Sequence, residues 1–149
     1  MDWLMFAVYM VAVCAAASTG AMYPPGPWYD ELDKPTWTPP NWLFPLAWTV
    51  LYVIIAYTAT VVSGLEGSRL AMAFWSLQLV LNALWAPVFF GLRKLGGAFL
   101  VLCLLWTAVM ATLIAFYAVQ PLMGLLLIPY LIWVSYAGAL NAEIWRRAR

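Results

Sequence analysis

Long uncharged segments constrain the fold of this chain more than any other feature. Asp, Glu, Lys and Arg are absent from residues 3–29, 35–65, 70–92 and 95–142. A membrane-spanning helix needs roughly 20 consecutive apolar residues, so each of the first three stretches can hold one span. The fourth is long enough for two spans and is interrupted near its middle by Gln120-Pro121. The pattern therefore predicts five transmembrane helices.

The fold class that follows is an all-α integral membrane protein, a five-helix bundle forming one membrane domain. The predicted helices cover about residues 3–22, 42–63, 70–91, 96–118 and 122–145. Residues 23–41 remain as a loop, which we interpret as a lid. Transmembrane strands are not expected, because the segments are continuously apolar instead of alternating. A composition of 66% hydrophobic residues also favours a membrane protein.

The first span has an alternative interpretation as a secretory signal. Residues 3–13 resemble its apolar region, and the small residues at 15–21 resemble a cleavage site. However, the residues before the span include Asp2 and no basic residue, whereas a signal peptide begins with positive charge. The apolar run also continues to about Met22. A transmembrane helix is the interpretation that these flanks favour.

Basic residues lie mostly on one side of the predicted bundle. The side that carries the 23–41 loop and the C-terminus holds Lys34, Arg93, Lys94, Arg146, Arg147 and Arg149. The opposite side holds only Arg69. Because Lys and Arg are enriched in cytoplasmic loops, we predict a multi-pass protein with the loop and the C-terminus in the cytoplasm.

The spans lack the groups that conventional membrane enzymes and pumps need. None contains Asp, Glu, Lys or Arg away from its ends, and the chain has no His. Proton-coupled exporters need a titratable group within the membrane, and intramembrane proteases need a Ser–His pair or paired aspartates. The commonest axial ligand of haem iron is also absent. A net charge of +1 gives no nucleic-acid signal.

The second predicted span begins in a loop rich in Pro and Trp. Residues 34–45 contain four prolines and two tryptophans and run directly into the apolar segment. Within that segment Trp48 and Tyr52 are one helical turn apart and share a face. A rigid loop above aromatic rings in a membrane is typical of a lid over a pocket for a flat, apolar ligand.

Polar and aromatic residues of three spans fall at similar depths below the lid. At about 1.5 Å per residue, Trp48 lies roughly 10 Å deep and Tyr52 roughly 15 Å deep. Asn82 lies roughly 13 Å deep, while Ala137 and Trp133 lie roughly 12 and 18 Å deep. We therefore predict that the second, third and fifth spans enclose one pocket beneath residues 23–41.

Two helical faces supply the remaining candidate residues for this pocket. One face of the third span carries Gln78, Asn82, Trp85 and Phe89, and one face of the fifth carries Tyr130, Trp133, Ala137 and Asn141. A single buried amide can equally serve as an interhelical hydrogen bond, and a tryptophan can belong to the interfacial aromatic belt. The deeper tryptophans fit that belt poorly. A buried Trp N–H needs a partner, so several around one volume indicate a ligand or trapped water.

Three motifs in three spans resemble the TspO/MBR family. Residues 34–52 follow the pattern Lys-Pro-x-Trp-x-Pro-Pro-x-Trp-x-Phe-Pro-x-x-Trp-x-x-Leu-Tyr. Residues 78–91 contain Gln-Leu-x-Leu-Asn-x-x-Trp followed by Phe-Phe-Gly, and residues 129–141 contain Pro-Tyr-Leu-x-Trp followed by Leu-Asn. The resemblance covers essentially the whole chain, and three ordered motifs make a chance match improbable.

The resemblance implies a five-helix bundle, usually a homodimer, that binds porphyrins, sterol-like lipids and isoquinoline or benzodiazepine drugs. The implied ligand is a porphyrin such as protoporphyrin IX or haem, with no obligatory cofactor. On this basis the predicted ligand-binding residues are Trp37, Trp48, Tyr52, Asn82, Trp85, Phe89, Trp133 and Ala137. The lid residues that match the family's porphyrin-contacting region are Trp28 and Tyr29. No catalytic or metal-binding residue is predicted.

One position departs from the family pattern. The family's sterol motif has an aromatic residue after the Leu-Asn pair, and this chain has Ala142 there, although Arg146 remains. We therefore expect reduced sterol affinity through this motif.

Three functions remain open on the sequence. The chain can be a receptor or sensor for tetrapyrroles, a passive or partner-driven translocator of such ligands, or an enzyme that degrades porphyrin in light. A scaffold without a ligand is the plain alternative. Ordinary acid–base or metal catalysis has no residues to carry it, so the sequence favours the receptor.

Overall fold

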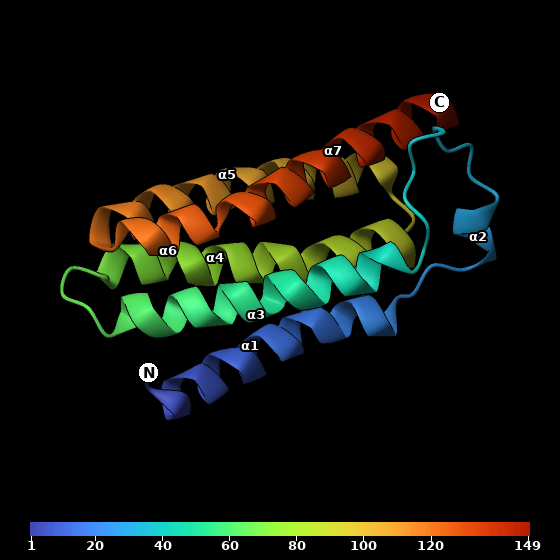
Figure 1. Cartoon of the computed structure of the whole chain (residues 1–149). Coiled ribbons are helices and arrows are strands. Elements are labelled where there is room, and N and C mark those ends of the chain that lie inside the picture. The colour runs from blue at the N-terminus through green and yellow to red at the C-terminus, as the bar shows by residue number, and fades with distance from the viewer.

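The computed structural model describes all residues 1–149 and is entirely helical outside its loops (Figure 1). The long helices are α1 (Trp3–Met22), α3 (Leu43–Ser63), α4 (Arg69–Ala86), α5 (Leu95–Val119) and α7 (Ile128–Ala148). The shorter elements are α2 (Pro27–Asp30), the π-helical segment η1 (Pro87–Gly91) and α6 (Pro121–Leu126). Five segments are long and apolar enough to cross a membrane. The predicted five-span all-α fold is thereby confirmed.

Prolines account for most of the departures from the predicted boundaries. The third span runs on from α4 into η1. Pro87 has no N–H to donate to the carbonyl four residues before it. At the other end of η1 the Leu92 N–H donates five residues back, to the Pro87 carbonyl, as in a π-helix. The predicted fifth span is two helices, α6 and α7, divided at Leu127. Pro129 follows that break and cannot donate a backbone bond to the turn before it. Together α6 and α7 still form a single candidate span.

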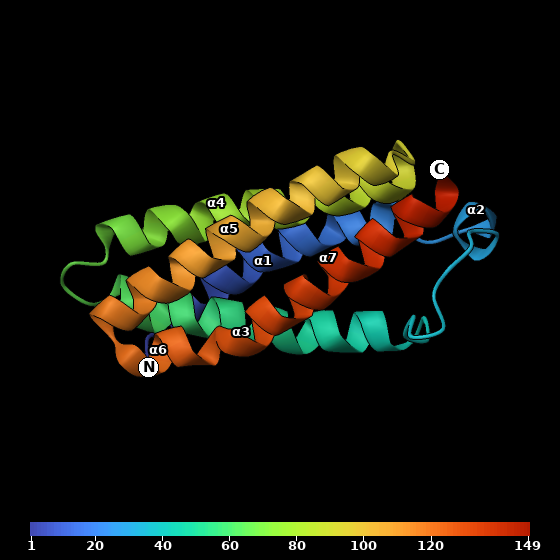
Figure 2. The same ribbon diagram turned by 90° about the horizontal axis from the view of Figure 1, so that it is seen from above.

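The helices form a closed ring in which each long helix packs on its neighbours. Helix α1 packs on α3 and α4, α4 packs on α5, α5 packs on α6 and α7, and α6 packs on α3. Helices α3 and α7 lie close together near α6 and separate towards the end that carries α2 (Figures 1 and 2). The C-terminus lies at that same end and the N-terminus at the opposite one. The site described below occupies the region where α3 and α7 separate.

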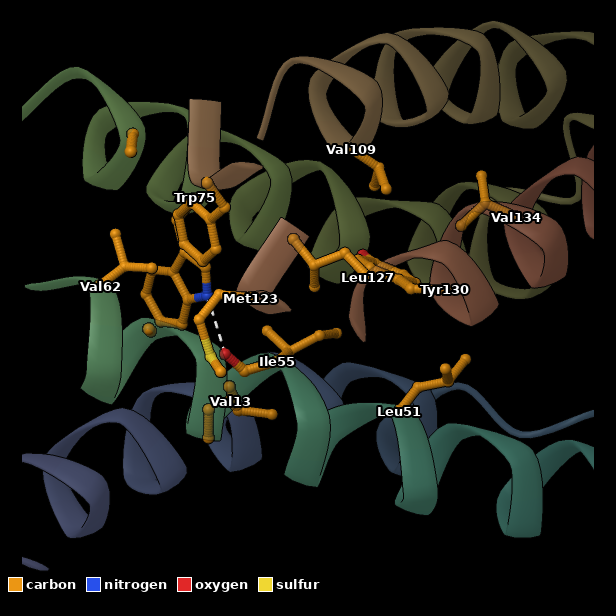
Figure 3. Close-up of a cluster of buried hydrophobic side chains, with 14 of the residues drawn as sticks. Val13, Leu51, Ile55, Val62, Trp75, Val109, Met123, Leu127, Tyr130 and Val134 are labelled. Atoms are coloured by element: carbon orange, nitrogen blue, oxygen red, sulfur yellow. Dashed lines mark hydrogen bonds between the residues drawn. The ribbon is translucent and has the colours of Figure 1, made fainter. Parts of the chain in front are cut away.

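The core of the bundle is apolar and includes one buried indole. Val13, Ile55 and Val109 are fully buried, and Tyr130 is 1% exposed. Trp75 is also buried, and its indole N–H donates to the backbone carbonyl oxygen of Ile55 at 3.1 Å (Figure 3). Because no water is present in a bilayer core, this bond satisfies a group that would otherwise cost several kcal/mol. Trp75 is therefore part of the core and not of the interfacial belt.

Candidate functional site

An aromatic cluster fills the region where α3 and α7 separate. We call it the α3–α7 cluster, and it consists of Phe44, Trp48, Tyr52, Tyr130 and Trp133. The Trp48 ring stacks on Tyr52, with 5.4 Å between centroids, and meets Tyr130 and Trp133 edge-on at 6.2 and 6.3 Å. Phe44 meets Trp133 edge-on at 5.8 Å. Offset and edge-to-face contacts of this kind are the favourable arrangements of aromatic rings.

A groove runs between α3 and α7 beside the cluster. Its volume is about 320 Å³, and it is lined by Leu43, Leu46, Ala47, Val50, Leu51, Pro129 and Trp133. Every one of these side chains is apolar except for the indole N–H of Trp133. Leu46 and Val50 are exposed, so the groove opens on the face of the bundle that lipid covers. A ligand dissolved in the membrane would meet Trp133 at this groove.

A hydrogen-bond chain links three helices behind the cluster. The Tyr52 hydroxyl donates to Asn82 Oδ1 at 3.2 Å, Asn82 Nδ2 donates to Tyr130 Oη at 2.9 Å, and the Tyr130 hydroxyl donates to Gln78 Oε1 at 2.7 Å. Gln78, Asn82 and Tyr130 are all buried. Asn82 therefore uses its oxygen and one amide hydrogen within the protein. Its first role is to connect α4 to α3 and α7.

Two buried donors in this region have no acceptor. These are Trp133 Nε1 and Gln78 Nε2. The buried indole of Trp75 donates to the Ile55 carbonyl, and the half-buried indole of Trp85 donates to Asn141. An unsatisfied buried donor costs about 1–3 kcal/mol, and such groups are rare in native proteins. Trp133 thus lines the groove and also carries a buried N–H without an acceptor.

A second aromatic cluster lies at the lid end of α4. We call it the lid-base cluster, and it consists of Trp28, Tyr29, Trp85, Phe89 and Phe90. Phe89 lies 4.8 Å from Trp85, 4.7 Å from Phe90 and 5.8 Å from Trp28, measured between ring centroids. Tyr29 lies 5.6 Å from Phe90. Burial raises the pKa of the Tyr29 phenol, and the neighbouring Asp30 adds to that shift. Through these ring contacts α2 packs against η1.

Asn141 anchors the lid-base cluster to the rest of the bundle. Its Oδ1 accepts from Trp85 Nε1 at 3.1 Å, and its Nδ2 donates to the Leu95 carbonyl oxygen at 2.9 Å. One buried amide therefore joins α4, the start of α5 and α7. The Leu95 carbonyl and the Trp85 indole would both lose this partner if Asn141 were replaced.

Replacement of Asn141 by leucine is expected to lower the stability of the folded protein by about 1–3 kcal/mol, because it removes both hydrogen bonds that the buried amide makes between helices. Thermal unfolding in detergent micelles measures this. Asn41→Leu is the matched control, since Asn41 is exposed in the lid. Equal melting temperatures for the two variants would contradict the expectation.

The lid is tied to α7 beside the α3–α7 cluster. The Tyr136 hydroxyl donates to the Trp37 carbonyl, and the two rings lie 5.6 Å apart. Tyr136 in turn stacks on Trp133 with 5.9 Å between centroids. Earlier in the lid, Lys34 Nζ donates to the Tyr29 carbonyl at 2.8 Å. The ring of Trp37, itself 44% exposed, is therefore connected through Tyr136 to the cluster.

The predicted site residues fall into two groups and not one. The first contains Trp37, Trp48, Tyr52, Asn82 and Trp133, and Ala137 packs against the core close by. The second contains Trp28, Tyr29, Trp85 and Phe89. Trp85 also touches the main core. The groove and the unpaired Trp133 donor both belong to the first group, which makes it the stronger candidate for a ligand site.

Three residues that contact the first group, Phe44, Tyr130 and Tyr136, are not among the predicted site residues. Tyr130 was placed on the correct face of the fifth span but was not chosen as a site residue. Phe44 and Tyr136 were not chosen either. Phe44 precedes Trp48 by four residues and Tyr136 follows Trp133 by three, so helical spacing alone would have indicated both.

Comparison with known proteins assigns the chain to a family. The model of the TspO/MBR family matches residues 4–146. The chain belongs to the TspO/MBR family. Among its relatives, the protein CrtK of Rhodobacter capsulatus is 52% identical over an alignment that covers 98% of this chain and 94% of that protein. The match is therefore close to full length in both proteins, as the three motifs predicted.

More distant TspO/MBR proteins also align. The tryptophan-rich sensory protein of Cereibacter sphaeroides is 47% identical, covering 98% of this chain and 92% of that protein. The human translocator protein is 38% identical, covering 80% of this chain and 73% of that protein. Membership of the TspO/MBR family thus rests on a family model and on relatives from bacteria and a mammal.

Proposed function

We propose that this TspO/MBR protein is a membrane receptor or sensor that binds porphyrins, such as protoporphyrin IX, at the α3–α7 cluster under the lid. The observation that carries the proposal is Trp133, which lines the groove between α3 and α7 and whose buried indole N–H has no acceptor. A planar ligand that stacks on Trp48 or Trp133 would supply both π-contact and an acceptor. Family membership supports the same conclusion.

The polar edge of a porphyrin would face the lid. A porphyrin such as protoporphyrin IX carries carboxylates on one edge, and these are costly to bury without a partner. Lys34 is already engaged with the Tyr29 carbonyl and lies 4.6 Å from the Tyr29 ring. Arg93 is exposed, lies over the Trp28 ring at 5.7 Å and forms no ion pair within the chain. Arg93 is therefore the better candidate for a carboxylate at the lid end.

We also propose further ligand classes, a homodimer and an orientation in the membrane. Sterol-like lipids and isoquinoline or benzodiazepine drugs are further ligand classes, with sterol affinity reduced because Ala142 supplies no aromatic ring. A homodimer is expected from the family resemblance, and the lid end is expected in the cytoplasm from the distribution of basic residues. Sterol binding as tight as in a relative with an aromatic residue at that position would contradict the expected reduction in sterol affinity.

A titration of protoporphyrin IX by tryptophan quenching tests the proposal. Trp133→Phe keeps an aromatic ring but removes the free N–H, and we expect its affinity to fall by roughly 3- to 10-fold. Trp106→Phe is the matched control, because Trp106 lies in a separate groove between α5 and α7 and its N–H already donates to Ser135 at 2.9 Å. Unchanged affinity in Trp133→Phe would remove the proposed role of this indole.

The same titration separates the three functions when it is repeated in light. Saturable binding in the dark with the pigment intact supports the receptor. Loss of pigment absorbance only in light and only with wild-type protein would favour a degrading enzyme. Faster equilibration of protoporphyrin IX across sealed vesicles that contain the protein would favour a translocator. The absence of saturable binding to the wild type would overturn the proposed function itself.

A further inference from the structure

The groove that contains Trp106 lies between α5 and α7, which pack side by side (Figure 2). Its volume is about 400 Å³, and it is lined by five residues of α5 between Phe99 and Thr107 and by three of α7 between Val134 and Gly138. No residue lines both this groove and the one between α3 and α7. The α5–α7 groove is therefore separate from the proposed porphyrin site.

The polar groups of the α5–α7 groove are already paired. Trp106 Nε1 donates to Ser135 Oγ at 2.9 Å, and Ser135 Oγ donates to the Leu131 carbonyl at 2.8 Å. Thr107 Oγ1 donates to the Cys103 carbonyl at 2.9 Å. A polar ligand would lose its hydration here and find no free hydroxyl or indole hydrogen in return. The groove therefore suits a hydrocarbon chain.

The length of the groove and an open position in it fit such a chain. From Phe99 to Thr107 the groove follows α5 for about 12 Å, which is close to half of the roughly 30 Å hydrocarbon core of a bilayer. Gly138 lines the groove, and no heavy atom lies within 4 Å of the Cβ that a larger residue would add there. Any larger side chain at Gly138 would take up that space.

At its lid end the groove continues into an aromatic and basic surface. Phe99, which lines the groove, lies 6.1 Å from Trp145 between ring centroids. Trp145 also lies against Gly96, where an added Cβ would be 2.9 Å from the indole ring. The guanidinium group of Arg149 lies over the Trp145 ring at 4.6 Å. Phe99 and Trp145 therefore connect the groove to Arg149.

The basic groups at this level are not neutralised by carboxylates of the chain. Arg149 is exposed and forms no ion pair, and the same holds for Lys94, which directly precedes α5. Arg146 and Arg147, in contrast, are paired with carboxylates. An anionic group at the membrane surface would thus meet uncompensated positive charge at the lid end of the groove.

We propose that the α5–α7 groove binds an anionic phospholipid, with one acyl chain along the groove and the phosphate beside Arg149. A tryptophan and an arginine at a helix end are common interfacial anchors. The groove that leads from Phe99 to Gly138 distinguishes this pair from a simple anchor, because it adds a place for the chain below the place for the headgroup.

Native mass spectrometry of the delipidated protein tests the proposal, with phosphatidylglycerol and phosphatidylcholine of identical acyl chains as probes. We expect one phosphatidylglycerol to bind roughly 3- to 10-fold more tightly than phosphatidylcholine, because only its headgroup has a net negative charge. Arg149→Gln should bring the ratio of the two affinities towards one. Arg69→Gln is the matched control, because Arg69 is an exposed arginine at the opposite end of the bundle.

Filling the groove should weaken binding of both lipids and leave their ratio unchanged. Gly138→Leu is expected to lower each affinity roughly 3- to 10-fold, because leucine occupies the space of several methylene groups. Gly20→Leu is the matched control, since Gly20 also has open space around its added Cβ but lies on α1. Arg149 is exposed, so Arg149→Gln still tests the proposal if Gly138→Leu does not fold.

The two cysteines report where the lipid binds in the wild type. Cys103 lines the groove, and Cys14 is exposed on α1. Phosphatidylglycerol should slow alkylation of Cys103 by N-ethylmaleimide and leave the rate at Cys14 unchanged. Peptide mass spectrometry measures both rates in one sample.

Four results would overturn the proposal. The first is equal phosphatidylglycerol affinity in Gly138→Leu and Gly20→Leu, and the second is an unchanged lipid ratio in Arg149→Gln. Competition by glycerol 3-phosphate, which has no acyl chain, would indicate a simple phosphate site. Protection of Cys103 by cholesterol as strong as by phosphatidylglycerol would assign the groove to sterols.

Discussion

Replacement of Trp48 by alanine is expected to weaken protoporphyrin IX binding by roughly 10- to 100-fold, the largest effect of any substitution in the α3–α7 cluster. Trp48 contacts Tyr52, Tyr130 and Trp133, and no other ring has as many partners within the cluster. Stacking of a flat ring on one aromatic side chain contributes about 1–3 kcal/mol. Removal of Trp48 deletes that surface and also loosens the rings on both sides. The measurement is the quenching titration in the dark.

Two variants make the result for Trp48 interpretable. Trp48→Phe retains a ring and should lose less affinity than Trp48→Ala. Trp106→Ala removes an indole of the same size from the separate groove between α5 and α7, and should bind protoporphyrin IX as the wild type does. Circular dichroism checks that each variant is folded. Equal affinities of Trp48→Ala and Trp106→Ala would show that the ligand does not use the α3–α7 cluster.

Replacement of Gly124 by alanine is expected to destabilise the folded protein by about 3 kcal/mol, which is large for the addition of one methyl group. A Cβ atom at Gly124 would lie 2.6 Å from Tyr117 Cβ and 2.7 Å from the Tyr117 Cα and backbone nitrogen atoms. Backbone atoms of a helix cannot rotate away as the end of a flexible side chain can. Helix α6 would have to move away from α5, and thermal unfolding in detergent micelles should show a lower melting temperature.

Gly138→Ala is the matched control for Gly124→Ala. No atom lies within 4 Å of the Cβ that alanine would add there, and Gly138 is within a helix. Alanine has a higher helix propensity than glycine by about 1 kcal/mol, so Gly138→Ala should be neutral or slightly stabilising. A lower melting temperature in Gly138→Ala than in Gly124→Ala would contradict the geometry of the α5–α6 junction.

The spans could be predicted from the sequence because membrane insertion depends on local properties. A run of apolar residues and the positions of charges are sufficient to place a helix in a bilayer. The five predicted segments therefore match the five observed spans closely. The errors are local as well: the break at Leu127 and the π-helical segment η1 follow from Pro129 and Pro87, whose effects on the helix were not considered.

The candidate site could be predicted only in part. Depth along each span placed Trp48, Asn82 and Trp133 near one another, and they belong to one group in the structure. The shared face of the third span added Trp85 and Phe89 to that group, yet their rings pack in the lid-base cluster. Depth fixes only one coordinate of a side chain. The direction in which each helix face points is set by how the helices pack.

The sequence by itself determined that five apolar helices span a membrane, that no charged group lies within them, and that aromatic and amide residues gather below a Pro-rich lid. These properties depend on residue type and spacing along one chain. Only the tertiary structure decided that Asn82 is bonded to Tyr52 and Tyr130, and that Gln78 and Trp133 keep unpaired donors. Hydrogen bonds between helices depend on helix rotation and separation to within about 1 Å, which no local pattern encodes.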